Sequence, residues 1–421
     1  MGHPSPSPLR RRALRALPAA GASLALLLAG CASTPSGSDD AADGAAESFE
    51  GVELTVWSGL YYEPFASVNA EQIQACADDL GLTVNLETLS EDYATKILQA
   101  ASSNTLPDVL LLDSTDVPRF GAEGILTDIG DVGLTTEGIS DSVASLGQYE
   151  GVQYGLPTQV ETYALFYDRA AFADAGVEEF PTTFDELVSV ASRLSEDGRY
   201  GIALPGATSD GAAPLFWLPF LLSAGGDPAD PTSEGAVAAV DLYQQLVETG
   251  GLSSEFVSWG WDAPDQYRSG KAVITASGPW DVVAEAPEIA DYGVAPYPTL
   301  DGSQESSVGI LGYNWSLPVS ADAEQQQAAA ALIECRVSEE NQLELADGGY
   351  IPALTSAQEA FVEATPAAAA FVDPIENAYN YAGELGAEWD RLSLVYGSAL
   401  QYAVVDGESA EDALARADAA H

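Results

Sequence analysis

The chain has 421 residues, and 47% of them are hydrophobic, which is enough for the cores of two or three domains and excludes a disordered protein. Acids outnumber bases by 65 to 14, so the formal net charge is −51. A surface of this sign repels nucleic acid phosphates and anionic headgroups, so neither is an expected partner. It also argues against a strongly anionic ligand, although a local arginine such as Arg119 or Arg268 could override the overall field.

The first 31 residues have the pattern of an export signal. Four arginines between positions 10 and 15 precede an apolar run, residues 16–28, that is shorter than the roughly 20 residues of a membrane-spanning helix. The run ends in Leu28-Ala29-Gly30-Cys31, which resembles a bacterial lipobox and implies cleavage before Cys31 and lipid on that residue. A core cysteine in a buried helix is the alternative. The arginines leave both Sec and twin-arginine export open.

The next segment, residues 31–50, is rich in Ser, Gly, Ala and acids and predicts a flexible tether. Strands and helices then alternate: strands at 53–57, 83–86 and 108–112, helices at 64–80 and 93–102. This alternation predicts a parallel sheet with crossover helices. Ligands of such sheets bind beyond the carboxyl ends of the strands, where Trp57 and Asp113 fall.

A polar stretch follows, residues 158–162, between two short apolar runs at 153–156 and 163–167. Such a stretch suits a connection that leaves one packed lobe and enters another, and Glu161 lies in it. Beyond it, Thr183-x-x-Glu186 has the pattern of a capping box that opens a helix.

The remaining elements are predicted from periodicity. Helices are expected at 184–194, 213–223 and 232–248, and strands at 201–204 and 272–276. Residues 292–295 and 308–317 are expected to be strands that return to the first lobe, followed by a helix at 325–336. From about residue 340 the chain is mostly helical.

Histidine is nearly absent, since only His3 and His421 occur. This excludes Ser-His-Asp and Cys-His catalysis and His-rich metal sites, and no phosphate or calcium loop is visible. We therefore expect no catalytic residues, no cofactor and no metal. Carboxylates and aromatics remain, and these can bind sugars through hydroxyls and ring faces. A glycosidase needs only two carboxylates, so that alternative stays open.

Several blocks resemble one family. They are Tyr154 to Pro157, Val160-Glu161-Thr162, Leu165 to Asp168, Tyr267 to Ile274 with Gly278-Pro279-Trp280, and Tyr292 to Pro298. Their order resembles that of the sugar-binding proteins of bacterial ABC importers, the maltose-binding-protein-like group. The resemblance implies an α/β, two-lobe periplasmic-binding-protein type II fold with hinge crossings and a ligand cleft. Lobe 1 would comprise 51–160 and about 292–336, and lobe 2 about 161–291 and 337–421.

The resemblance also implies ligand contacts. Trp280 matches a tryptophan that stacks on sugar, with a core tryptophan as the alternative. Glu161 matches an acid that binds sugar hydroxyls, and a solvated hinge acid is its alternative. Asp113 matches another such acid, or it could cap a helix. Tyr350 resembles a loop residue near the ligand.

Further candidates come from position alone. Trp259 and Trp261 share a loop, and one of them is expected to line the cleft because exposed tryptophan is costly. Trp57 and Tyr62 belong to a similar cluster. Asn314 and its neighbour Trp315 alternate along a strand, so only one can face the cleft, and we favour the amide.

Two cysteines remain, Cys76 and Cys335. Export permits a disulfide, and two buried thiols are the alternative.

We therefore predict a monomeric receptor, anchored by lipid at the outer face of the bacterial cytoplasmic membrane. It would capture a neutral mono- or oligosaccharide by hinge closure and deliver it to ABC permease subunits. The alternatives are a non-sugar solute such as a polyol or peptide, a cell-surface glycoside hydrolase, and an adhesin for polysaccharide.

Overall fold

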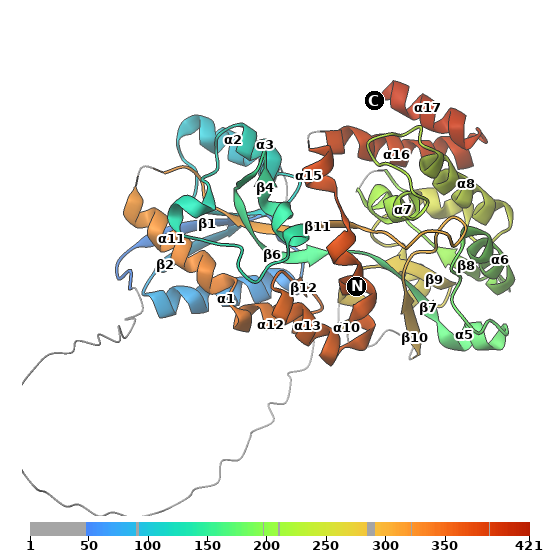
Figure 1. Ribbon diagram of the computed structural model, residues 1–421, viewed down its shortest axis with the longest axis horizontal. Helices are drawn as coiled ribbons and strands as arrows, with labels where there is room; N and C mark the ends of the chain where they lie inside the picture. The colour runs from blue at the N-terminus through green and yellow to red at the C-terminus, as the bar shows by residue number, and fades with distance from the viewer. Residues whose placement is uncertain are drawn as a thin grey trace, which may run out of the picture. The chain divides into compact units, whose positions relative to one another are not determined.

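Two β-sheets organise the protein (Figure 1). The computed structural model describes residues 48–89, 92–196, 198–208, 211–283, 291–320, 322–386 and 388–421, all within the unit Ala46–His421. The predicted signal peptide, Cys31 and most of the predicted tether lie outside the described residues. No helix in the described ranges is both long and apolar enough to cross a bilayer.

The larger sheet has seven strands in the order β12-β6-β11-β3-β1-β2, with β13 also paired to β11. They are β1 (Glu53–Ser58), β2 (Thr83–Thr88), β3 (Val109–Asp113), β6 (Gly155–Glu161), β11 (Gly309–Ser316), β12 (Ile351–Pro352) and β13 (Tyr379–Asn380). The smaller sheet, in the order β10-β7-β9-β8, contains β7 (Ala164–Asp168), β8 (Tyr200–Ala203), β9 (Ala272–Ser277) and β10 (Tyr292–Ala295). A hairpin joins β4 (Gln148–Tyr149) to β5 (Val152–Gln153).

The helices are α1 (Phe65–Leu80), α2 (Tyr93–Ser103), α3 (Val117–Ala122), α4 (Asp141–Ala144), α5 (Arg169–Asp174), α6 (Phe184–Leu194), α7 (Ala212–Ser223), α8 (Glu234–Glu248), α9 (Pro264–Arg268), α10 (Trp280–Val283), α11 (Ala323–Arg336), α12 (Glu339–Asp347), α13 (Thr355–Ala364), α14 (Ala369–Val372), α15 (Tyr381–Leu385), α16 (Glu388–Val404) and α17 (Ala410–Ala420). Short 3₁₀ turns are η1 (Ile129–Val132), η2 (Ser145–Gly147), η3 (Ser254–Ser258), η4 (Pro366–Ala368) and η5 (Asp373–Asn377).

The first five elements confirm the predicted alternation. Strand β1 pairs in parallel with both β2 and β3, and α1 and α2 make the crossovers. The Val-Leu-Leu-Leu run of β3 is buried on both faces, as expected of a central parallel strand. Gly81 ends α1 in the left-handed conformation, φ 72°, which glycine adopts without a Cβ penalty.

The two sheets are joined where β6 runs into β7. Only Thr162 and Tyr163 separate these strands, so the crossing lies at the end of the predicted connection 158–162, and residues 158–161 belong to β6 instead. Strand β11 lies beside β6 and returns antiparallel to it. Residues 371–380 form a third segment at the same place. The Thr162 hydroxyl donates to the carbonyl of Phe371 at 3.0 Å, and Asn380 Nδ2 donates to Ser145 Oγ at 2.7 Å.

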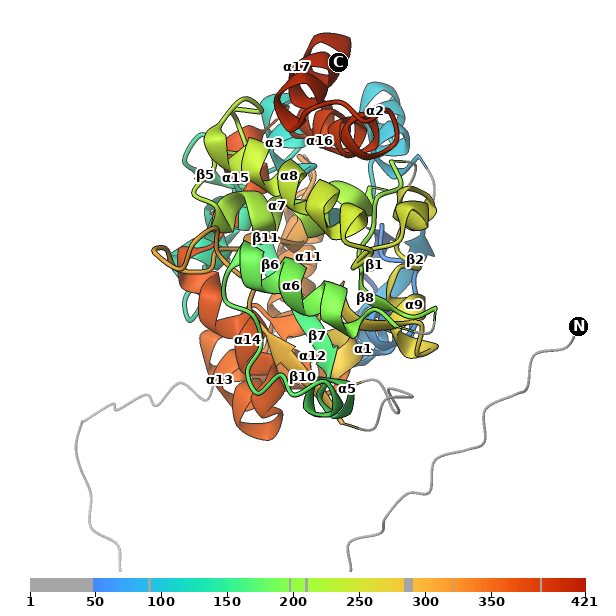
Figure 2. The same ribbon diagram turned by 90° about the vertical axis from the view of Figure 1, so that its right-hand side faces the viewer.

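Helices cover the smaller sheet. The predicted capping box of α6 is formed, with Thr183 and Glu186 each bonding the other's backbone. Helix α7 is apolar on all sides and buried, as a helix enclosed by other elements should be. In Figure 2, α16 and α17 lie side by side and both contact α8. Together these elements form the largest hydrophobic core.

Strand pairing differs from the predicted lobe boundaries for three strands. Strand β10 pairs with β7 in the smaller sheet, although residues 292–295 were expected in lobe 1. Strands β12 and β13 pair with β6 and β11 in the larger sheet, although residues 337–421 were expected in lobe 2. All three have partners that lie far away in the sequence, and periodicity carries no information about such pairing.

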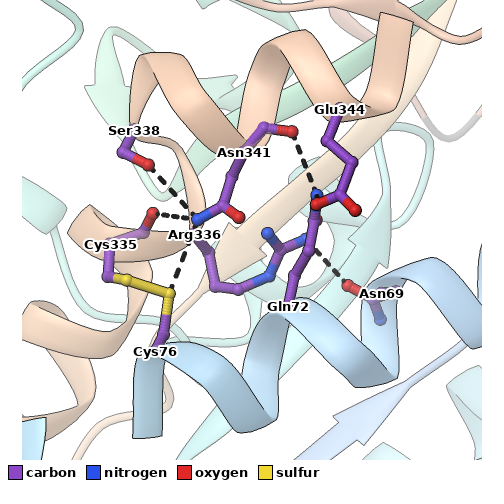
Figure 3. The surroundings of a disulfide bond; sticks show 8 residues. All are labelled: Asn69, Gln72, Cys76, Cys335, Arg336, Ser338, Asn341 and Glu344. Atoms are coloured by element: carbon purple, nitrogen blue, oxygen red, sulfur yellow. Dashed lines mark hydrogen bonds between the residues drawn. A yellow bond between two sulfur atoms is a disulfide. The ribbon is translucent and has the colours of Figure 1, made fainter. Parts of the chain in front are cut away.

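Cys76 and Cys335 form a disulfide that joins α1 to α11 (Figure 3). Asn341 Nδ2 donates to the carbonyl of Cys335 at 2.7 Å, and this bond ties α12 to the same place. Beside it, the buried Arg336 donates through Nη2 to Asn69 Oδ1 at 3.1 Å. The return of the chain to the larger sheet is thus fixed both covalently and by polar contacts.

Candidate functional site

Two carboxylates lie at strand ends of the larger sheet, one on each side of β11. Asp113 ends β3 and is opposite Tyr313, and Glu161 ends β6 and is opposite Leu311. Because β11 separates the two strands, the carboxylate-bearing residues are two strand spacings apart, about 10 Å across the sheet.

Each carboxylate is oriented by hydrogen bonds. Asp113 Oδ1 accepts from the backbone N–H and the hydroxyl of Thr115, at 2.8 and 2.7 Å. Asp113 therefore stabilises a turn, whereas Asp116 is the residue at the start of α3. Glu161 Oε1 accepts from the Tyr62 hydroxyl at 3.3 Å and from Gln159 Nε2 at 3.1 Å. The second oxygen of each carboxylate is not used in these bonds.

The pKa values of three neighbouring acids, Asp113, Asp116 and Glu161, are raised. Burial, and then the Asp113 charge, raise the pKa of Glu161 to about 7. Burial, and then the same Asp113 charge, raise the pKa of Asp116 to about 7, and burial raises the pKa of Asp113. The group therefore carries less than its full negative charge near neutral pH.

Aromatic rings surround the acids on the same sheet. The Tyr350 ring lies 4.5 Å from that of Phe65, and Phe65 stacks on Tyr62 at 6.4 Å. Tyr61 contacts Tyr62 edge-on and is 56% exposed. Burial, and then the charge of Glu161, raise the pKa of Tyr350 to about 12, so this ring lies near the carboxylate.

A second aromatic group begins at Tyr163, two residues after Glu161. The Tyr163 ring lies 4.5 Å from Phe216 and edge-on to Trp280 at 6.3 Å. Phe216 in turn contacts Trp261 at 5.5 Å, and Trp261 is 44% exposed. Residues 161–163 thus connect the acids of the larger sheet with the tryptophans of the smaller one.

Two predicted tryptophans do not join these groups. Trp259 is buried, packs in the core of the smaller sheet and contacts Tyr200. Trp57 packs on the cluster that contains Leu110 and Leu112, beneath the sheet edge. Of the loop pair, Trp261 is the exposed residue, so it stays the candidate of the two for lining the cleft.

Asn314, our choice on β11, is buried. Its side chain is 0% exposed, and its Nδ2 donates to the carbonyl of Leu146 at 3.2 Å. Trp315 is buried as well. Alternation could not separate the two residues because β11 is covered on both faces, so Asn314 and Trp315 are both buried. The register with β6 shifts between Tyr313 and Asn314, where Thr158 of β6 has no residue opposite it.

Sequence reasoning missed Tyr163, Tyr313, Phe216 and Asp116. A signal existed for Tyr163, which follows the polar crossing directly, and for Asp116, which lies three residues after Asp113. Nothing in the local pattern distinguishes Phe216 from the other apolar residues of α7.

A hollow of about 400 Å³ between α8 and α17, lined by Val237 and Leu414, contains none of the predicted ligand residues. Over the described ranges, no three acids or cysteines are arranged to hold a metal ion.

The architecture is that of two-lobe, maltose-binding-type proteins, as a comparison with solved structures shows. The structure of the GacH receptor of Streptomyces glaucescens, solved unliganded and with acarbose, matches with a TM-score of 0.74 and 24% identity over 87% of this chain and 97% of that one. A cyclic α-maltosyl-1,6-maltose binding protein from Arthrobacter globiformis matches with a TM-score of 0.74 and 22% identity, over 88% of this chain and 97% of that one.

Sequence comparison names the family. Residues 71–370 match the model of the bacterial extracellular solute-binding proteins, and the chain belongs to this family. A galactooligosaccharide-binding protein of Bacillus subtilis is 24% identical over 76% of this chain and 75% of its own length. A maltooligosaccharide ABC transporter solute-binding lipoprotein of Streptococcus pneumoniae is 27% identical over 79% of this chain and 78% of its own.

Proposed function

We propose that this protein is the substrate-binding lipoprotein of an ABC importer and that it captures a neutral mono- or oligosaccharide. The observation that carries the proposal is the junction at residues 161–163. Glu161 ends β6, and Tyr163, two residues later, contacts Trp280 directly and Trp261 through Phe216. Carboxylates accept hydrogen bonds from ring hydroxyls, and aromatic faces cover the apolar C–H faces of a sugar.

The two sheets would be the cores of two lobes that close on the ligand. The sugar would contact the acids and Tyr62 on one lobe and the tryptophans on the other, and contacts to both would favour the closed form. The three segments that cross between the sheets would form the hinge. We propose binding without bond chemistry, and membership of the solute-binding family supports this.

Export and attachment complete the proposal. Cleavage before Cys31 and lipidation of that residue would hold the protein at the outer face of the cytoplasmic membrane, beside its permease subunits. The name of the pneumococcal relative, a lipoprotein, supports this anchor. Acid excess over most of the chain supports a neutral ligand over a phosphorylated or acidic one.

A sugar panel tests the function. The purified protein is heated with neutral mono- and oligosaccharides, and a binding sugar raises the unfolding midpoint. New reducing ends over time would instead favour the hydrolase. With the best sugar, Glu161→Gln and Trp280→Ala should weaken binding, whereas Glu363→Gln and Trp389→Phe, outside the proposed site, should not. Unchanged affinity in both site variants would refute the site.

A further inference from the structure

Arg268, at the end of α9, is bound to two carboxylates close to the proposed stacking tryptophan. Its Nη2 donates to both oxygens of Asp281, at 2.7 and 2.6 Å, and its Nη1 donates to Asp265 Oδ1 at 2.6 Å. Asp281 also accepts from the Ser277 hydroxyl at 2.5 Å, and its side chain is only 17% exposed. The guanidinium is therefore engaged on two sides by acids of this chain.

In the sequence, Trp280 lies between Ser277 and Asp281, two residues of this hydrogen-bond network. Ser277 ends β9, Asp281 follows Trp280 in the one-turn helix α10, and both are bonded to each other. The indole rests on Gly278, where an added Cβ would come within 2.2 Å of the ring. Tyr163 contacts the same ring edge-on. One face of the indole is thus supported, and the side chain remains partly exposed.

We infer that Arg268 and Asp281 are positioning residues that hold the Trp280 indole as a fixed platform for the ligand. The bonds from Arg268 Nη2 to both oxygens of Asp281 immobilise the backbone on the C-terminal side of Trp280. The Ser277 hydroxyl, which donates to the same carboxylate, immobilises it on the N-terminal side. This inference rests on the proposed function for the ligand's identity, and it deepens it. Because Arg268 Nη1 and Nη2 already donate to Asp265 and Asp281, an anionic solute would have to compete with these carboxylates for the guanidinium.

The first test needs no ligand. The near-ultraviolet circular dichroism of Trp280 is obtained as the difference between the parent and Trp280→Phe. A fixed indole gives a distinct signal, and Asp281→Asn and Arg268→Gln should remove most of it, while Arg268→Lys keeps part. Arg416→Gln is the matched control, because Arg416 also bonds two carboxylates, Asp406 and Glu408.

A second variant covers the case in which the pair is needed for folding. Gly278→Ala leaves the ion pair in place but displaces the indole, so it should also reduce the signal while the far-ultraviolet spectrum is unchanged. If the Trp280 difference spectrum is the same in the parent, Asp281→Asn and Arg268→Gln, the positioning role is wrong.

The second test uses the best sugar from the panel. Asp281→Asn should weaken its affinity by about 2- to 10-fold, the range expected when one bound side chain must be immobilised from a mobile state. In a Trp280→Ala background the same change should have no further effect, because the platform is already gone. Additive losses would contradict the inference. If no sugar binds the parent, the proposed function fails, and the ligand-free spectra still decide the positioning role.

Discussion

Glu161 should lower the stability of the protein near neutral pH, although it is a proposed binding residue. Its pKa is raised to about 7 from the ordinary 4.5, mainly by burial. Below pH 4.5 it is protonated in the folded and unfolded states alike, so it has no effect. As pH rises from 4.5 to 7, the unfolded state loses its proton first, and the folded state is progressively destabilised.

The magnitude follows from the shift. One pKa unit corresponds to about 1.4 kcal/mol, so a rise from 4.5 to about 7 costs on the order of 3 kcal/mol above pH 7. Glu161→Gln removes this cost while keeping a side chain that can bond Tyr62 and Gln159.

Urea unfolding at pH 5, 6, 7 and 8, followed by tryptophan fluorescence, measures the effect. The parent should lose stability across this range, and Glu161→Gln should lose less, so that the variant is the more stable protein at pH 8. Glu363→Gln, an exposed change on α13, serves as the control. The reasoning is refuted if Glu161→Gln and the parent show the same slope against pH, or if the variant is the less stable protein at pH 8.

Four further outcomes are expected. Sugar affinity should increase as pH rises through 7, because ligand hydroxyls bond the ionised form of Glu161; a flat titration profile would contradict this. Trp261→Ala should weaken sugar binding by about tenfold with little change in melting temperature, since the ring is 44% exposed. Asn314→Ala should reduce the free energy of unfolding by about 1–3 kcal/mol, seen in urea, by leaving the Leu146 carbonyl unpaired. Replacing Cys76 and Cys335 by serine should cost up to about 5 kcal/mol by chain entropy, and a reductant should then have no further effect.

Local signals predicted the parts of the fold that depend on neighbours in sequence. The alternation from β1 to β3, the Gly81 helix end and the Thr183–Glu186 box are all set within a few residues. The pairing of β10 with β7 depends on a partner more than 120 residues away, and no periodic pattern encodes it.

The candidate site likewise combines residues that sequence patterns single out with residues whose environment depends on tertiary packing. The resemblance singled out Asp113 and Glu161, which end strands on either side of β11, and Trp280, which contacts Tyr163; their contact with a ligand stays a prediction. The choice of Asn314 over Trp315 had no support from alternation, because tertiary packing covers both faces of β11 and buries both residues. Trp259 and Trp261 share a loop, and only packing against Phe216 or Tyr200 distinguishes the exposed one from the buried one.

The sulfur bridge between α1 and α11 closes the backbone into a covalent ring of 260 residues, counted from Cys76 through Cys335 at a separation of 259. The β6–β7 crossing and the strand return through β11 both belong to this ring. A single proteolytic cut at any peptide bond within the ring leaves one connected molecule, which would run as two fragments only after reduction. For a receptor that works outside the cell among proteases, nicking of a surface loop would then leave the two lobes held to each other.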